Sequence, residues 1–405
     1  MRKASANCLF AAIVLECSLS LSLIALRPLR PSVSVALSQD GGLLSQSDVF
    51  VSGQDGYHTY RIPALVVTTK GTLLAFCEGR RSSQSDAGEI DMLVKRSVDS
   101  GRSWSNQQVI WHDDSNTCGN ACPVVDQTTG QVWLLLTHNL GQDNEKAIGQ
   151  RRSEGTRTAW VCQSGDDGLT WSQPREITKT VKKLEWGWYA TGPGIGIQLR
   201  YGAHAGRLLI PVNYSVQPNP YRSDLFEYGD AVIHSDDHGQ TWQLGGSVPG
   251  LGIDEPQVVE LEDGIVMMNM RSSYGNLRVI SISKDAGQTW SEAWRDAALV
   301  EPPCEASILR FTERPKWGKS RILFSNPASA KGRANLTVRL SSDEGQSWAV
   351  SKQVNAGPSA YSCLAVLSDM TIGCLYEQGN ADAYEKITLA RFSLPWLTDG
   401  ADRVE

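Results

Sequence analysis

The sequence SDDHGQTW at residues 235–242 has four close copies elsewhere in the chain. All five follow the pattern SxDxGx[ST]W. The other copies are SVDSGRSW at 97–104, SGDDGLTW at 164–171, SKDAGQTW at 283–290 and SSDEGQSW at 341–348. Five shared positions recurring five times are far beyond chance at ordinary residue frequencies. The chain is therefore built from structural repeats.

Each copy predicts a hairpin turn. Its Asp can fold a carboxylate back onto turn N–H groups, and its Gly can adopt the positive φ that such turns need. The aspartates are Asp99, Asp166, Asp237, Asp285 and Asp343, and the glycines are Gly101, Gly168, Gly239, Gly287 and Gly345. We expect the closing tryptophans to re-enter a strand and to bury their indoles between neighbouring repeats. These are Trp104, Trp171, Trp242, Trp290 and Trp348.

Short apolar runs separated by polar turns predict strands along most of the chain. Examples are VWLLLTHN at 132–139, RLLIPVNYS at 207–215 and RILFSN at 321–326. Successive Asp residues of the repeat lie 67, 71, 48 and 58 positions apart, which suits one four-stranded propeller blade per repeat. We predict an all-β, six-bladed β-propeller with five recognisable repeat hairpins. DVFVSG at 48–53 and KITLARFSL at 386–394 are expected to pair and close the ring.

The first 37 residues differ from the rest of the chain. Arg2 and Lys3 precede an apolar stretch from Cys8 to Leu26, and SVA at 34–36 suits a cleavage site. This pattern predicts an export signal over 1–37, followed by one propeller domain over 38–405. Because Arg27 and Arg30 follow the apolar stretch, an uncleaved membrane anchor is the alternative. We expect an exported protein, which contacts a membrane only if the segment is retained.

Composition excludes several classes of function. The net charge of −6 and the lack of a basic run argue against nucleic acid as a partner. The six histidines show no metal-ligand spacing, and no phosphate-binding glycine loop is found, so we expect neither metal nor cofactor. Seven cysteines follow the leader, an odd number that cannot pair completely. Cys118 and Cys122 are the candidates for a disulfide.

Three arginines at the ends of apolar strands are the first clue to a site. They are Arg61 in YRIPALV, Arg271 at the end of VMMNMR and Arg333 just before NLTVRL. Taken alone, Arg61 is more simply explained by snorkelling or by a core carboxylate. Strands of different blades converge on one funnel, however, so three guanidiniums there would clamp a carboxylate.

The chain resembles the exo-sialidase (neuraminidase) family of the bacterial and animal propeller type over residues 45–395. Besides YRIP and the repeats, which correspond to the family's Asp boxes, several motifs agree in order and spacing. They are FCEGRRSSQSDAGEIDMLVKRS at 76–97, EPQVVEL at 255–261, NMRSS at 269–273, GRANLTVRL at 332–340, AYSCLAVLSD at 360–369 and GCLYE at 373–377. The interleaved set is specific to the family, whereas Asp boxes alone are not.

The resemblance implies roles for the binding residues. Arg61, Arg271 and Arg333 match the triad that holds the sialic acid carboxylate, and Glu377 matches the acid that steadies the first arginine. Arg80 looks like an auxiliary arginine of the pocket, although the adjacent Arg81 is an alternative. Asn120 and Tyr214 lie where relatives have substrate-facing loops, and structural roles are equally open for both. Ala121 replaces a proline that often follows Asn120 in relatives.

The resemblance also implies a catalytic set. Asp86 matches the general acid/base, Tyr361 the nucleophile and Glu255 the carboxylate that activates it. Taken alone, these residues would be a solvated loop aspartate, a strand aromatic and a loop acid. A neutral phenol approaches an anomeric carbon that already bears a carboxylate without charge repulsion, and two displacements retain configuration.

We therefore expect a retaining exo-α-sialidase that acts on terminal sialic acids of glycoproteins, glycolipids or oligosaccharides. The alternatives are a trans-sialidase, an enzyme for a related nonulosonic acid and a non-catalytic sialic-acid-binding propeller.

Overall fold

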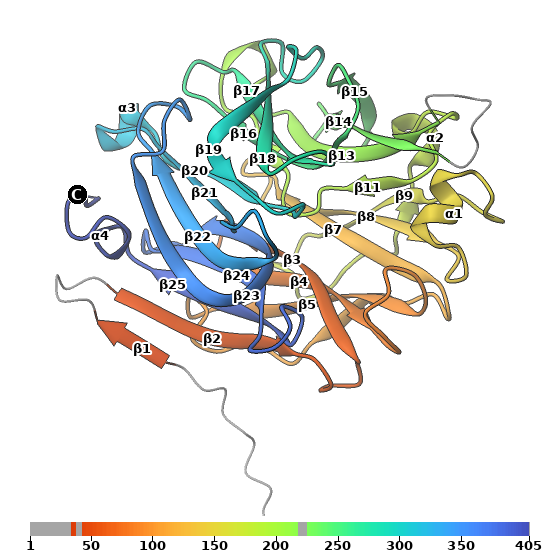
Figure 1. Ribbon diagram of the computed structural model, residues 1–405, viewed down its shortest axis with the longest axis horizontal. Coiled ribbons are helices and arrows are strands. Elements are labelled where there is room, and N and C mark those ends of the chain that lie inside the picture. The colour runs from red at the N-terminus through yellow and green to blue at the C-terminus, as the bar shows by residue number, and fades with distance from the viewer. Residues whose placement is uncertain (1–33, 38–42, 218–224, 405) are drawn as a thin grey trace, which may run out of the picture. The chain divides into compact units, whose positions relative to one another are not determined.

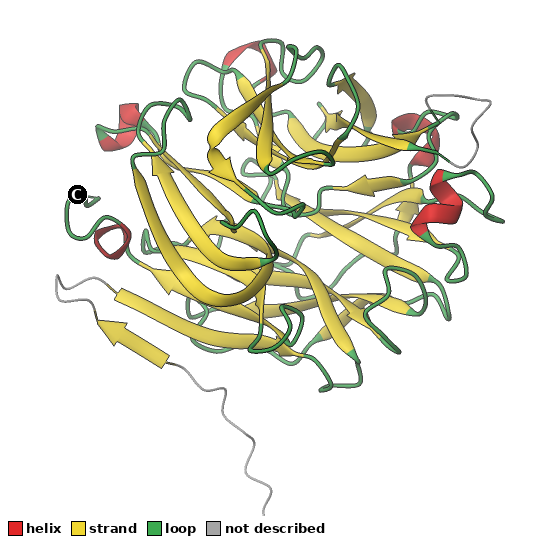
Figure 2. Ribbon diagram, viewed as in Figure 1, coloured by secondary structure: helices red, strands yellow, loops and turns green. Residues whose placement is uncertain are grey.

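The computed structural model describes residues 34–37, 43–217 and 225–404, and nearly all regular structure in them is β-strand (Figures 1 and 2). The predicted all-β class is therefore confirmed. Residues 32–405 cluster as one unit. Most of the predicted leader lies outside the described residues, so the boundary at residue 37 stays a prediction. Among the described residues, no helix combines the length and apolar character needed to cross a membrane.

The strands form four sheets of mainly antiparallel pairs. One sheet contains β3 (Thr59–Val67), β4 (Leu73–Arg80), β5 (Ile90–Ser97), β6 (Gln108–Trp111), β7 (Thr117–Val125), β8 (Val132–Asn139), β9 (Thr158–Ser164) and β10 (Arg175–Glu176). The next contains β11 (Tyr189–Thr191), β12 (Ile197–Gln198), β13 (Leu208–Val216), β14 (Glu227–Ser235) and β15 (Gln243–Ser247). A third contains β16 (Ile253–Glu260), β17 (Val266–Ser272), β18 (Leu277–Ser283) and β19 (Trp294–Val300).

The fourth sheet joins the two ends of the described chain. It contains β20 (Ser307–Thr312), β21 (Arg321–Pro327), β22 (Ala334–Ser341), β23 (Val350–Val366), β24 (Ile372–Gln378), β25 (Lys386–Phe392), β2 (Leu43–Val51) and β1 (Ser34–Leu37). The red β2 lies beside the blue β25 in Figure 1, with Asp48 opposite Thr388 and Phe50 opposite Ile387. The predicted closing pair is thereby confirmed. Short helices lie between strands: α1 (Glu145–Gly149), α2 (Thr178–Val181), the 3-10 turn η1 (Gly202–His204) and α3 (Arg314–Trp317). A further short helix, α4 (Leu394–Leu397), follows β25.

Neighbouring repeats merge into larger sheets. The 17-residue strand β23 pairs with β22 along its first part and with β24 along its second. One parallel pair, Ile90 with Thr117, joins β5 to β7. Because these links remove the boundaries between repeats, the number of six blades stays a prediction.

The repeated octapeptide forms the same hydrogen-bonded turn in all five copies. In the third copy the Ser235 hydroxyl donates to Asp237 and accepts from the N–H of Gly239. The Asp237 carboxylate accepts from both the N–H and the hydroxyl of Thr241. The other four copies repeat these bonds. Every Gly of the set has a positive φ, as predicted.

The tryptophans of the repeats do not re-enter a strand, contrary to the prediction, but they do pack between neighbouring repeats. None lies in a strand; each precedes the point where the ladder resumes. The reason is local, because the residue before each Trp gives its N–H to the Asp carboxylate instead of a neighbouring strand. The indoles nevertheless pack between repeats. Trp171, after β9, meets Phe76 of β4 edge-on at 5.6 Å, and Trp242, after β14, meets Trp133 of β8 at 6.5 Å between ring centroids.

The seven cysteines of the described chain are all free and buried. The suggested Cys118–Cys122 disulfide is therefore wrong. Both residues lie on β7, four positions apart in an extended strand, and their side chains pack into two different apolar clusters.

Gly239 gives a sharp test of the turn. Its φ is +87°, and a Cβ there would lie 2.2 Å from Cε2 of Trp133. We expect Gly239→Ala to lower the free energy of unfolding by roughly 2–4 kcal/mol, from strain and overpacking together. Gly250 is the matched control, because its φ is +96° and a Cβ there meets nothing within 4 Å. Gly250→Ala should cost only about 1 kcal/mol in urea unfolding. Equal losses would contradict this account of the packing.

Candidate active site

The structure brings the three arginines together around one cavity of about 520 Å³. Arg61 comes from β3, Arg271 from β17 and Arg333 from the loop just before β22. The three arginines therefore come from segments far apart in the sequence and meet at one cavity, as expected from the sequence. The guanidinium groups of Arg61 and Arg333 each lie 5.3 Å from the ring centroid of Tyr361.

Glu377 anchors the first arginine. This fully buried carboxylate on β24 accepts a 2.7 Å hydrogen bond from Nε of Arg61 and a 2.9 Å bond from the Ile62 N–H. Its other oxygen accepts from the Tyr361 N–H at 3.1 Å. Burial opposes the charge of Arg61, but Glu377 and the adjacent tyrosines raise the pKa of Arg61 above its usual range. The arginine therefore presents a permanent positive charge to the cavity.

Tyr361, Glu255 and Arg271 form a connected chain. The Tyr361 hydroxyl donates a short hydrogen bond to Oε1 of Glu255, and Oε2 of Glu255 accepts from Nη1 of Arg271 at 2.6 Å. Burial alone would raise the pKa of Glu255, but Arg271 and the tyrosine hydroxyl hold it below its usual range. Burial, and then Glu255, raise the pKa of Tyr361 well above its usual value. At rest the site therefore holds a neutral phenol against an ionised carboxylate.

An irregularity in β16 aims Glu255 at the tyrosine. The pairing of β16 with β17 shifts register between Asp254 and Gln257, and Glu255 has a φ of +42°. The Glu255 N–H donates to Oδ1 of Asp254 at 2.9 Å, which holds this backbone conformation. Such bulges commonly redirect a side chain at a functional site.

Arg80, and not Arg81, faces the cavity. Arg80 ends β4, is almost fully buried and pairs with Glu78 at 2.7 Å and with Asp86 at 2.6 Å. Arg81 points elsewhere, pairing with Asp91 at 2.8 Å and lying over the Tyr57 ring. Because alternate residues of a strand share a face, Glu78 and Arg80 lie on the same side of β4.

Asp86 lies on the loop between β4 and β5, as expected, and its side chain is 61% exposed. Burial by the cavity wall would raise its pKa, but Arg80 and then Arg61 hold the pKa of Asp86 below its usual range. This carboxylate is thus ionised at neutral pH. An anion bound at the arginines would weaken their field and favour its protonated form.

The two less specific candidates have different places. Asn120 lines the cavity and accepts a short hydrogen bond from Arg157. Tyr214 does not line it, contrary to expectation; its ring stacks on Trp186 with centroids 3.8 Å apart. Residues alternate between the two faces of β13, so the preceding Asn213 reaches the cavity instead.

Arg157 and Trp188 were missed by the sequence analysis. Arg157 is buried, lies 4.0 Å from the Trp188 ring centroid and lines the cavity with it. Its guanidinium also donates to Thr137 at 2.9 Å and Asn139 at 2.8 Å. Arg157 directly precedes β9, as Arg333 directly precedes β22, so this residue could have been found by the same pattern.

Glu145 and Tyr228 form a second missed pair on the cavity wall. The Tyr228 hydroxyl donates to Oε1 of Glu145 at 2.6 Å, joining α1 to β14. Burial raises the pKa of Glu145 to about 7, although the tyrosine bond opposes the shift. Tyr384 is a third missed residue; its ring lies 3.8 Å from the Arg61 guanidinium, and its hydroxyl accepts from Arg333 at 2.7 Å. None of the three belongs to a recognisable motif.

Asp230 on β14 predicts a pH effect on stability. It is fully buried, and neither carboxylate oxygen has a hydrogen-bond partner among the described residues. Burial, and then Asp254, raise the pKa of Asp230 well above its usual value. A raised folded-state pKa stabilises the protein below the unfolded-state value of about 4, and this contribution is lost as pH rises toward the folded-state pKa.

We therefore expect Asp230→Asn to raise Tm relative to wild type at pH 8 and to change it little at pH 4. Asp236 is the matched control on the same segment. Two hydrogen bonds from Arg207 lower its pKa, so Asp236→Asn should lower Tm at pH 8. Thermal unfolding followed by circular dichroism at both pH values measures the two effects. A pH-independent difference between Asp230→Asn and wild type would contradict this reasoning.

The class of protein follows first from a comparison with a known repeat family and with a known relative. The family described as "BNR repeat-like domain" matches residues 71–375, and such repeats build a β-propeller, which confirms the predicted propeller class; the number of six blades stays a prediction. A sialidase of Micromonospora viridifaciens is 37% identical over 368 residues, covering 88% of this chain and 54% of that protein. This chain thus spans about half the length of that relative.

Two further comparisons define the family. Sialidase-2 of Rattus norvegicus is 31% identical over 83% of this chain and 93% of its own length. The solved structure of Hadza microbial sialidase Hz136 is 31% identical, with a TM-score of 0.76 over 87% of this chain and 69% of that one. The chain belongs to the sialidase family.

Proposed function

We propose that this protein is a retaining exo-α-sialidase acting on sialylated glycoconjugates. The observation that carries the proposal is the chain of contacts from the Tyr361 hydroxyl through Glu255 to Arg271. A tyrosine is a weak nucleophile at neutral pH unless a base takes its proton, and an ionised Glu255 in direct contact supplies that base. The likeness to proteins named sialidase supports the same activity.

Arg61, Arg271 and Arg333, together called the carboxylate clamp, bind the carboxylate of the terminal sugar in this proposal. Three guanidiniums fix the ring orientation for in-line attack and stabilise the carboxylate while the adjacent anomeric carbon becomes oxocarbenium-like. Tyr361 attacks that carbon as Glu255 takes the phenolic proton, and Asp86 gives a proton to the leaving oxygen. Asp86 then removes a proton from the water that attacks the anomeric carbon, and Glu255 returns its proton to the Tyr361 oxygen as the glycosyl-tyrosine bond breaks. Two inversions retain the α configuration.

The anomer released first tests this mechanism. Proton NMR of an α-sialoside digest should show the α-anomer of the free sugar before mutarotation. Early β-anomer would contradict the tyrosine intermediate. Binding without any release would contradict the enzymatic proposal, and transfer to added lactose in preference to water would assign a trans-sialidase instead.

Asp86→Asn tests the assignment of the acid. Protonation of the leaving group matters for a sugar alkoxide and little for a good aryl leaving group. We expect the variant to lose about 10²-fold or more in kcat/KM on sialyllactose and much less on an aryl α-sialoside at the glycosylation step. Equal losses on both substrates would contradict proton donation by Asp86.

We also propose that the protein is exported, on the basis of the basic and apolar residues of segment 1–37. Mass spectrometry of the mature N-terminus distinguishes cleavage near Ala36 from a retained anchor.

A further inference from the structure

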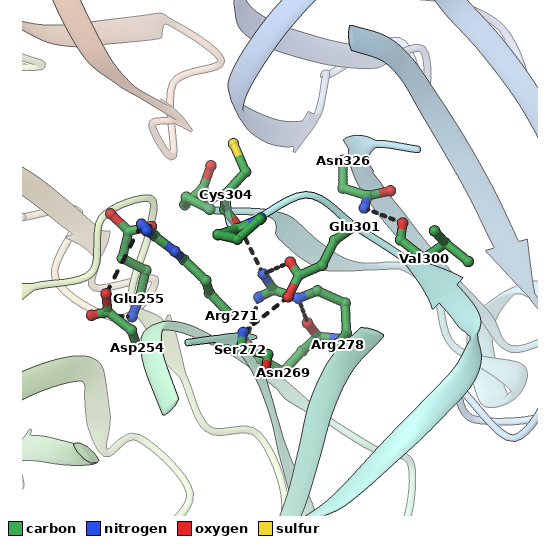
Figure 3. Close-up of polar contacts among 12 residues, drawn as sticks. Asp254, Glu255, Asn269, Arg271, Ser272, Arg278, Val300, Glu301, Cys304 and Asn326 are labelled. Atoms are coloured by element: carbon green, nitrogen blue, oxygen red, sulfur yellow. Dashed lines mark hydrogen bonds and ion pairs between the residues drawn. The ribbon is translucent and has the colours of Figure 1, made fainter. Parts of the chain in front are cut away.

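A fully buried ion pair lies directly behind Arg271. Nη1 of Arg278 on β18 contacts Oε2 of Glu301 at 2.7 Å, and neither side chain is exposed (Figure 3). Neither residue lines the cavity. Because desolvation offsets much of the attraction in such a pair, its role is better judged by the groups that it holds in place.

The pair holds the strand end that carries Arg271. The ladder between β17 and β18 runs up to Met270 opposite Val279 and stops before Arg271. The Arg278 side chain secures the backbone two residues before Arg271, donating to the side-chain oxygen of Asn269 at 2.6 Å and to its backbone carbonyl at 3.2 Å. Oε1 of Glu301 accepts the N–H of Ser272 at 2.9 Å. The backbone is thus held on both sides of Arg271.

The same guanidinium also holds the loop between β19 and β20. Nη1 of Arg278 donates to the Cys304 carbonyl at 2.9 Å. One residue earlier, the Pro303 carbonyl accepts from Nη2 of Arg333 at 3.0 Å. The Cys304 side chain belongs to the small apolar cluster that includes Tyr361. A shift of this loop would therefore move the partner of Arg333.

We propose that Arg278 is a positioning residue of the carboxylate clamp, which sets Arg271 through Asn269 and Glu301 and sets Arg333 through the 301–306 loop. The inference rests on the proposed sialidase function, since it assigns these arginines to a substrate carboxylate. The planar guanidinium is required because its donors reach acceptors on three residues of two segments at once, Asn269 on β17 and Glu301 and Cys304 in the 301–306 loop. A lysine keeps the charge but concentrates its donors at one point.

Arg278→Lys tests the proposal against Arg321→Lys. Arg321 is the matched control, because it is almost as buried as Arg278 and pairs with Asp402 at 2.7 Å, and neither of these two residues lines the cavity. We would measure Tm, KM and kcat on an α-sialoside, and the Kd of a 2,3-unsaturated sialic acid analogue by calorimetry. For Arg278→Lys we expect Kd and KM to rise about tenfold, with a smaller fall in kcat and a loss of Tm similar to that of the control. For Arg321→Lys we expect Kd and KM within about twofold of wild type.

Equal Kd values for the two lysine variants would overturn the positioning role, since loss of stability alone would then explain Arg278. Should Arg278→Lys not fold, Glu301→Gln replaces it. Its single amide oxygen cannot serve both Ser272 and Arg278, so Kd should rise about threefold, and an unchanged Kd would overturn the proposal. If the wild-type protein binds the analogue without releasing sialic acid, the proposed function is contradicted, but the Kd values of the variants still test the positioning role of Arg278. If the wild-type protein neither binds the analogue nor releases sialic acid, the proposed function and the positioning role of Arg278 are both contradicted.

Discussion

Tyr361→Phe should lower kcat/KM for an α-sialoside by about 10³-fold or more. The substitution removes one oxygen, the atom that we expect to form the bond with the anomeric carbon. That oxygen is also the donor to Glu255. The ring keeps its packing beside Arg61 and Arg333. Steady-state assays with a fluorogenic substrate measure the loss.

Binding should survive the same substitution. Arg61 keeps its bond to Glu377, and Arg333 keeps its bonds to Tyr384 and Pro303, so two of the three clamp arginines are untouched. We expect the Kd of the unsaturated analogue to stay within about fivefold of wild type. Tyr376→Phe is the matched control, because Tyr376 is fully buried and its hydroxyl has no partner among the described residues. Full activity in Tyr361→Phe would exclude the tyrosine as nucleophile.

The features that sequence predicted well are those determined by neighbours in the chain. The octapeptide contains both partners of the hydrogen bonds that form its turn, so Asp237 and Gly239 could be assigned without any tertiary information. The closing pair of β2 and β25 was also predictable, because a ring of blades closes only when strands from the two ends of the chain pair. The position of Trp242 outside a strand was not predictable. It depends on whether the N–H of Thr241 bonds to the Asp237 carboxylate or to a neighbouring strand.

The site residues divide in a similar way. Arg61, Arg271 and Arg333 share a pattern, a guanidinium at the end of an apolar strand, and this could be read directly. Strand periodicity says that Asn213 and Tyr214 face opposite ways, but it does not say which faces the funnel; the stacking of Tyr214 on Trp186 decides that. Glu145 meets Tyr228 across 83 positions, and no local pattern reports such a contact.

Glu255→Gln should lower kcat/KM by about 10²- to 10⁴-fold, the usual contribution of a general base. The amide oxygen can still accept from the Tyr361 hydroxyl, but it cannot take the proton, and the charge facing Arg271 is lost. Glu260→Gln is the control on the same strand, because that buried carboxylate accepts from the N–H groups of Arg200 and Tyr201, outside the catalytic cavity. It should leave kcat/KM within about twofold of wild type.

The double variant tests whether Glu255 acts through Tyr361. A base whose only catalytic task is to activate one nucleophile has nothing to contribute once that nucleophile is gone. The combined Tyr361→Phe and Glu255→Gln variant should therefore lose little more than Tyr361→Phe alone, because residues that act as a unit are not additive. If the two losses multiply, Glu255 must assist the reaction by a separate route, such as holding Arg271 against the substrate carboxylate.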